Sequence, residues 1–157
     1  MRQLILSLRR THDIGSLQAI CTSLQCDLPQ NTLLIPIPGW KAKSRSNPLP
    51  ELICRCLERP TIQLLRRCRP TVGQHRLNRR QRVSNQSGSF KLNHAPTQWT
   101  SHAWTNQRRQ QQVWLVDDIV TTGATVVAAN QALQASGVTI QGVLCLARPP
   151  WELHPVI

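Results

Sequence analysis

The spacing of apolar and polar positions divides the first part of the chain into helices and strands. Apolar residues recur every three or four positions in residues 3–10 and 14–25, as they do in amphipathic helices. A short apolar run at residues 33–37 ends among prolines, which predicts a strand that leads into a loop. The pattern then predicts a helix over residues 48–57 and a second strand over residues 61–65.

A long polar segment separates these elements from the rest. Residues 66–110 are rich in Arg, Gln and Ser, and the segment is far longer than an ordinary connection. It is followed by a predicted strand at residues 113–117, a helix over residues 123–136 and a last strand at residues 142–146.

Residues at the helix ends agree with these boundaries. Asn47 is a favourable cap for the helix over residues 48–57, and Pro48 suits its first position. Gly137 predicts the end of the helix over residues 123–136. Helical spacing directs three side chains of that helix to the core: Val126, Val127 and Leu133.

The order of the predicted elements is that of an α/β domain with a parallel sheet. We expect a single domain over residues 1–157, with residues 66–110 as an insertion. Ligands of such sheets bind beyond the carboxyl ends of the strands, where the strand order reverses. The loops after Pro38 and after Asp117 are therefore expected to lie side by side.

The charge of the chain indicates an anionic partner. Lys and Arg number 19 against 7 Asp and Glu, which gives a net charge of +12, and no acid occurs between Glu58 and Asp117. Such clustering favours nucleic acid or a polyphosphate as the partner, although a basic solvated surface is the simpler alternative. No apolar run approaches the roughly 20 residues of a membrane helix, so we expect a cytoplasmic protein without membrane insertion.

The six cysteines do not have the spacing of a structural zinc site. None of them forms a C-x-x-C pair. We therefore expect no zinc and no metal ion coordinated directly by Cys or His. Reduced thiols also agree with a cytoplasmic location.

The segment Val113–Thr125, VWLVDDIVTTGAT, carries the clearest chemistry. Asp117 and Asp118 follow the apolar strand, where their oxygens suit the hydroxyls of a ribose or a Mg²⁺ ion held through water. The alternative is a polar turn without a ligand, since Thr with Gly is ordinary turn chemistry. Backbone N–H groups and hydroxyls of the following turn suit a phosphate at a helix N-terminus. These residues are Thr121, Thr122, Gly123, Ala124 and Thr125.

The same segment closely resembles the 5-phosphoribosyl-1-pyrophosphate (PRPP) motif of type I phosphoribosyltransferases. A second stretch, residues 69–90, is similar to the pattern Q-x-x-L-x-x-x-x-R-x-x-N-x-x-G-x-F of the ComF family. The matching residues are Gln74, Leu77, Arg82, Asn85, Gly88 and Phe90. The segments IPIPGWKAKSRSNP and LILSLRRTHD also resemble the family, with Arg9 at a position where the family has Lys.

The resemblance implies a type I phosphoribosyltransferase-like fold that binds PRPP, or a related sugar phosphate, together with Mg²⁺. It places Lys41, Lys43 and Arg45 opposite the pyrophosphate. Residues 66–110 then correspond to a hood over the second substrate, with four residues of interest: Arg69, Gln74, Arg82 and Asn85. The zinc ribbon usual at the N-terminus of the family is expected to be missing.

The family resemblance also implies a link to natural competence, the uptake of external DNA, and partners among the competence machinery proteins. A transferase would displace pyrophosphate at the anomeric carbon, but no residue identifies itself as a general base and the acceptor is not evident. The alternative is a non-enzymatic nucleic-acid-handling or ligand-gated binding factor on the same fold. Single-stranded DNA is its expected ligand, with Trp99 and Trp104 either stacked on bases or partly buried.

Overall fold

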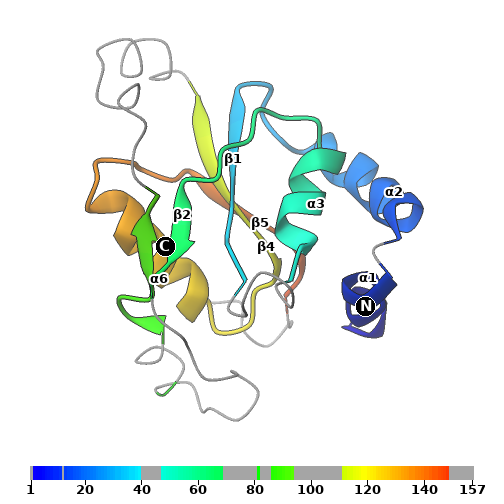
Figure 1. The fold of residues 1–157 in the computed structure, drawn as a ribbon. Coiled ribbons are helices and arrows are strands. Elements are labelled where there is room, and N and C mark those ends of the chain that lie inside the picture. Colours follow the sequence, from blue (N-terminus) through cyan, green and yellow to red (C-terminus); the bar gives the residue numbers. More distant parts are fainter. Residues whose placement is uncertain are drawn as a thin grey trace.

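A three-stranded parallel sheet forms the centre of the protein. The computed structural model describes residues 2–11, 13–39, 47–68, 81, 86–93 and 111–148. The strands lie in the order β1-β4-β5, and their bounds are Thr32–Pro36, Gln112–Ile119 and Gly142–Ala147. Helices flank both faces of this sheet, so the prediction of an α/β fold with a parallel sheet is confirmed (Figure 1).

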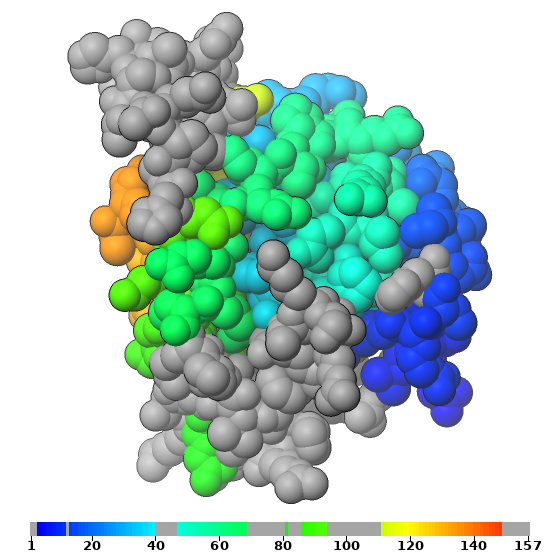
Figure 2. Space-filling model, viewed as in Figure 1, coloured from blue at the N-terminus to red at the C-terminus, as the bar shows by residue number. Residues whose placement is uncertain are grey.

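The two faces of the sheet are covered by different elements. One face carries α1 (Arg2–Thr11), α2 (Ile14–Gln25) and α3 (Leu49–Cys56). The other carries α6 (Ala124–Gln134) and a small antiparallel sheet of β2 (Leu65–Arg67) and β3 (Phe90–Leu92). Figure 2 shows α1 and α2 at one side of the molecule and α6 at the other, with α3 between them. Among the described residues, no helix combines the length and apolar character needed to cross a membrane.

Neighbouring residues of the central strands belong to opposite cores. Leu34 and Val116 pack with the three N-terminal helices, whereas Ile35 and Leu115 pack with α6 and the small sheet. Successive side chains of a strand point to opposite faces, which produces this division. Every residue of β1 is buried, as expected for a strand covered on both sides.

The direction of chain progression reverses between β1 and β4. After β1 and α3, the chain returns along the outer edge of β1. There the Leu34 N–H donates to the Pro60 carbonyl, and the Leu34 carbonyl accepts from the Ile62 N–H, each at 2.9 Å. After β4 and α6, the chain adds β5 on the opposite side. The boundary between β1 and β4 is therefore the position where ligands of open α/β sheets bind.

The strand predicted over residues 61–65 is wrong in its bounds and its pairing. Only Thr61 forms a bridge to the parallel sheet, while β2 begins at Leu65 and pairs antiparallel with β3. Leu64 and Leu65 are buried beneath α6, and this packing draws the chain away from the edge of β1. The segment 66–110 thus contributes the end of β2 and all of β3.

The remaining predicted elements are confirmed within one or two residues at each end. Gly137 ends α6 as predicted: at φ 77° its N–H donates to the Gln134 carbonyl at 2.9 Å, and the Val138 N–H donates to the Leu133 carbonyl at 3.1 Å. This is the hydrogen-bond pattern of a Schellman motif.

The prediction for one side chain of α6 is wrong. Val126 and Leu133 are buried as predicted, but Val127 is 38% exposed. Ala129 lies between the two buried residues at helical spacing and takes the inward position. Val127 is rotated about 100° from Val126 around the helix axis and faces outward.

Gly142 provides a test of the sheet packing, because it lies opposite Trp114 in the β4–β5 register. A Cβ atom at Gly142 would lie 2.7 Å from the Trp114 ring. We expect Gly142→Ala to lower the free energy of unfolding by about 1–3 kcal/mol, measured by urea denaturation. Gly15→Ala is the control, since its Cβ would meet only a side-chain oxygen at 3.5 Å. Equal effects of the two substitutions would contradict this packing.

Candidate functional site

Both acids lie within β4, whereas the predicted strand at residues 113–117 included only Asp117. The pairing with β5 continues past both acids, because Ile119 lies opposite Ala147 and the Val120 N–H donates to the Ala147 carbonyl at 3.1 Å. Asp117 and Asp118 are therefore held on a rigid strand at its carboxyl end. The carboxyl end of β4 lies beside that of β1, at the position where the strand order reverses.

The turn after β4 forms a pocket with the first acid of the pair. Its wall is made by Asp117 and residues 119–126. Gly123 has a φ of 72° directly before α6, a left-handed conformation that favours glycine. The structure thus brings Asp117 together with all five residues predicted to hold a phosphate: Thr121, Thr122, Gly123, Ala124 and Thr125.

This pocket offers hydrogen-bond donors to a ligand. The Thr122 Oγ1 atom is buried and has no hydrogen-bond partner among the described residues. Gly123 gives α6 no side-chain cap, and the helix begins with the Val127 N–H bonded to the Gly123 carbonyl at 2.9 Å. A buried hydroxyl without a partner is costly, and the N-terminus of a helix attracts anions. Both features are typical of a phosphate-binding turn.

Asp118 accepts hydrogen bonds from three donors of the protein. Its carboxylate is 2% exposed, and its Oδ2 atom accepts from Arg9 Nε at 2.6 Å and from Asn47 Nδ2 at 2.8 Å. Its Oδ1 atom accepts from the Ile119 N–H at 2.9 Å. These contacts join α1, the start of α3 and β4 at one carboxylate. Of the two acids, Asp117 is the one that lines the pocket.

Asp117 has an electrostatic environment that opposes its ionisation. Burial raises its pKa above the usual range for a carboxyl, and the charge of Asp118 raises it further. The Asp118 N–H donates to Asp117 Oδ1 at 2.9 Å and acts in the opposite direction, as does the charge of Arg9. The ligand-free site therefore favours a neutral Asp117, and a bound cation would favour the ionised form.

Two partners of the acidic pair have roles that sequence reasoning missed. Arg9 was noted only for its family position, and it is 109 residues away from Asp118 in the sequence. Asn47 was predicted as the helix cap, but α3 begins one residue later than predicted and Pro48 takes the cap position. Asn47 Oδ1 still accepts from the Leu49 N–H at 3.2 Å. Its contact with Asp118 is additional. Neither contact has a signal in the local sequence.

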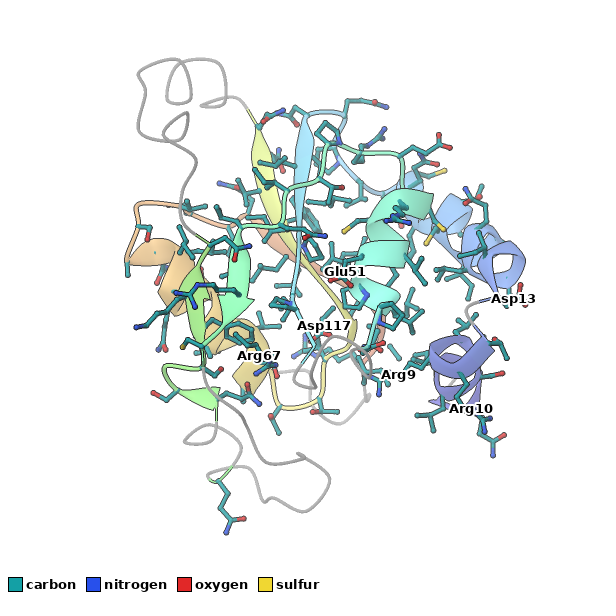
Figure 3. The ribbon with its side chains drawn as sticks, in the orientation of Figure 1. Arg9, Arg10, Asp13, Glu51, Arg67 and Asp117 are labelled. Atoms are coloured by element: carbon teal, nitrogen blue, oxygen red, sulfur yellow. The ribbon has the colours of Figure 1, made fainter. Side chains whose placement is uncertain are left out.

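Arg67 is a second cation near the acidic pair. From β2 it donates Nε to the Pro38 carbonyl at 3.0 Å and Nη1 to Gln86 Oε1 at 3.1 Å, and its guanidinium lies 4.4 Å from the centre of the Phe90 ring. Burial lowers the pKa of Arg67 to about 10, against the opposing charge of Asp117. Figure 3 shows Arg9, Asp117 and Arg67 at the same end of the sheet.

The remaining predicted site residues lie outside the described part of the chain. They are Lys41, Lys43 and Arg45 of the basic loop and Arg69, Gln74, Arg82 and Asn85 of the hood. The flanking residues Pro38 and Asn47 are described, and both contact side chains of the site. Within the described residues, no group of three or more His, Cys, Asp or Glu side chains could hold a metal ion.

No protein-family model matches this chain, and no curated protein matches it. Any family assignment therefore depends on the motif residues themselves. In the structure, motif residues 121–125 line one pocket together with Asp117.

Replacing Asp117 should stabilise the protein without ligand. The pKa of Asp117 is raised in the folded state, so its contribution to stability is most favourable below the pKa of the unfolded state. This contribution is lost as the pH rises through the pKa of the folded state. We therefore expect Asp117→Asn to raise the free energy of unfolding by about 1–3 kcal/mol near neutral pH and by less near pH 4. Asp13→Asn is the control, because its hydrogen bonds with Ser16 lower the pKa of Asp13 and should give the opposite trend. Denaturation at several pH values measures both, and parallel profiles would contradict this account.

Removing Arg9 should destabilise the protein. Arg9→Gln leaves the buried Asp118 carboxylate without its cation, and we expect a loss of about 1–3 kcal/mol in the free energy of unfolding. Arg10→Gln removes the same charge from an exposed position of α1 and should change stability by less than about 0.5 kcal/mol. Chemical denaturation of both variants makes the comparison. Similar losses would show that general charge matters rather than this ion pair.

Proposed function

We propose that this protein binds PRPP with Mg²⁺ as a phosphoribosyltransferase-like protein of the ComF family. The observation that carries the proposal is the pocket between Asp117 and the turn into α6. The 5-phosphate would occupy this turn, and the ribose hydroxyls would face Asp117. Asp118 would position Asp117 and Asn47 rather than contact the sugar.

The position of the pocket in the fold supports a ligand that extends from the turn toward the end of β1. The pocket opens at the carboxyl end of β4, and the neighbouring strand β1 ends alongside at Pro36. A sugar with a phosphate at one end and a diphosphate at the other would extend from the turn toward the end of β1. The basic residues after β1, Lys41, Lys43 and Arg45, would then meet the diphosphate.

The donor set of the site suits a hydrated Mg²⁺ ion that arrives with its ligand. The carboxylate of Asp117 lines the pocket, and hard oxygen donors are the preferred partners of Mg²⁺ in proteins. When bound, the ion would neutralise the diphosphate and assist its departure. Asp117 would hold the ion indirectly, through water, in its ionised form.

If the protein is a transferase, catalysis would depend on positioning and charge. The turn at residues 121–125 would fix the phosphate end while Asp117 orients the ribose for displacement of pyrophosphate at the anomeric carbon. The resemblance in sequence supports the link to DNA uptake, and the short apolar runs and unpaired cysteine spacing support a cytoplasmic location. A binding factor without transferase activity would use the same pocket.

Calorimetric titration with PRPP and Mg²⁺ tests the proposal. We expect Thr122→Val to weaken binding of both PRPP and ribose 5-phosphate by roughly fivefold to tenfold, because it replaces the buried hydroxyl by a methyl group. Asp117→Asn should weaken PRPP binding in the presence of Mg²⁺. Thr139→Val, at an exposed position before β5, is the matched control and should bind as the unmodified chain does.

Two outcomes would contradict the proposal. The first is no binding of PRPP or ribose 5-phosphate by the unmodified chain, and the second is unchanged affinity in Thr122→Val. Binding of single-stranded DNA that PRPP does not compete with would favour the nucleic-acid-handling alternative.

A further inference from the structure

Arg67 is a half-buried cation whose direct partners are all neutral. Its hydrogen bonds go to a backbone carbonyl and to the side-chain amide of Gln86, and its face contacts the Phe90 ring. Among the described residues, no carboxylate lies within ion-pairing distance of it. Asp117 influences Arg67 by charge but does not bond to it. Burial of a charge without an opposite charge is costly, which suggests that a ligand supplies the anion.

A buried polar network holds Arg67 in place. Gln86 is 1% exposed, and its Oε1 atom accepts from Arg67 and from Ser89 Oγ at 3.3 Å. The Ser89 carbonyl accepts from the Cys68 N–H at 3.0 Å, and Arg67 lies opposite Phe90 in the β2–β3 register. The guanidinium is therefore held by Gln86 before β3, by the Phe90 ring of β3 and by the Pro38 carbonyl. Its orientation does not depend on a ligand.

The contact with Pro38 connects this network to the end of β1. The peptide unit is planar and trans, so the bond to the Pro38 oxygen also fixes the direction of the Gly39 N–H. Arg67 thus determines the orientation of a backbone donor at the strand end next to Asp117. Under the proposed function, this strand end is where the diphosphate of PRPP would lie.

We propose that Arg67 is a positioning residue for the diphosphate of PRPP, which fixes the Pro38–Gly39 peptide and keeps an unneutralised positive charge near Asp117. This inference rests on the proposed function and adds the basis of selectivity. Ribose 5-phosphate has the phosphate and the ribose but no diphosphate. Arg67 should therefore discriminate PRPP from ribose 5-phosphate.

The test compares the affinities of these two ligands, each with Mg²⁺, by calorimetry. We expect Arg67→Gln to lower the ratio of PRPP affinity to ribose 5-phosphate affinity by at least about tenfold, because it removes the positive charge and the hydrogen bond that orients the Pro38–Gly39 peptide. Arg66→Gln is the matched control: it removes the same charge from the adjacent, exposed position of β2 and should leave the ratio unchanged. A merely structural role would reduce both affinities together.

A second variant tests the same role if Arg67→Gln does not fold. Gln86→Glu places a carboxylate at the position that now lies 3.1 Å from Arg67, so the guanidinium is neutralised but stays in place. We expect the affinity ratio to fall in this variant too. An unchanged ratio in both Arg67→Gln and Gln86→Glu would overturn the role of Arg67 and leave the proposed function standing. Failure of the unmodified chain to bind either ligand would overturn both.

Discussion

The arrangement of the site depends on the hydrogen bonds that the Asp118 carboxylate accepts. This carboxylate receives donors from Arg9 of α1, from Asn47 two residues before α3, and from its own strand. The carboxylate is 2% exposed, and the Arg9 guanidinium places an opposite charge 2.6 Å from it, which offsets the cost of burying the charge. Two segments distant in the sequence, α1 and the chain before α3, are therefore joined to β4 by one buried group. Asp117, which lines the pocket, is adjacent to this group and accepts a hydrogen bond from the Asp118 N–H.

The two adjacent acids have different roles because they lie on a strand. Consecutive strand residues project to opposite faces, so Asp118 meets the elements on the α1 side and Asp117 lines the pocket with the turn into α6. Their charges still interact, and Asp118 adds to the effect of burial in raising the pKa of Asp117. Sequence alone presented the acids as an equivalent pair, since adjacency along the chain does not reveal which side chain has partners.

Local signals predicted most of the described fold, and long-range contacts could not be predicted in this way. Periodicity located the central strands, and Gly137 marked the end of α6, because these features depend on neighbouring residues. The turn at Gly123 was predicted for the same reason. The strand at 61–65 was misplaced because its pairing depends on burial of Leu64 and Leu65 beneath α6. Periodicity likewise could not identify Arg9 or Arg67, whose partners lie in other elements.

The position of α1 links the N-terminal part of the chain to the charge of the pocket. Arg9 interacts with Asp118 directly and with Asp117 through its charge, and both interactions raise the pKa of Arg9 against the opposing effect of burial. The interaction is reciprocal: the positive charge at the end of α1 opposes the rise in the pKa of Asp117. Docking of α1 therefore favours the ionised form of Asp117, the form suited to a ribose hydroxyl or a hydrated cation. Packing of α1 against the sheet and ionisation of Asp117 are thus coupled through the guanidinium of Arg9.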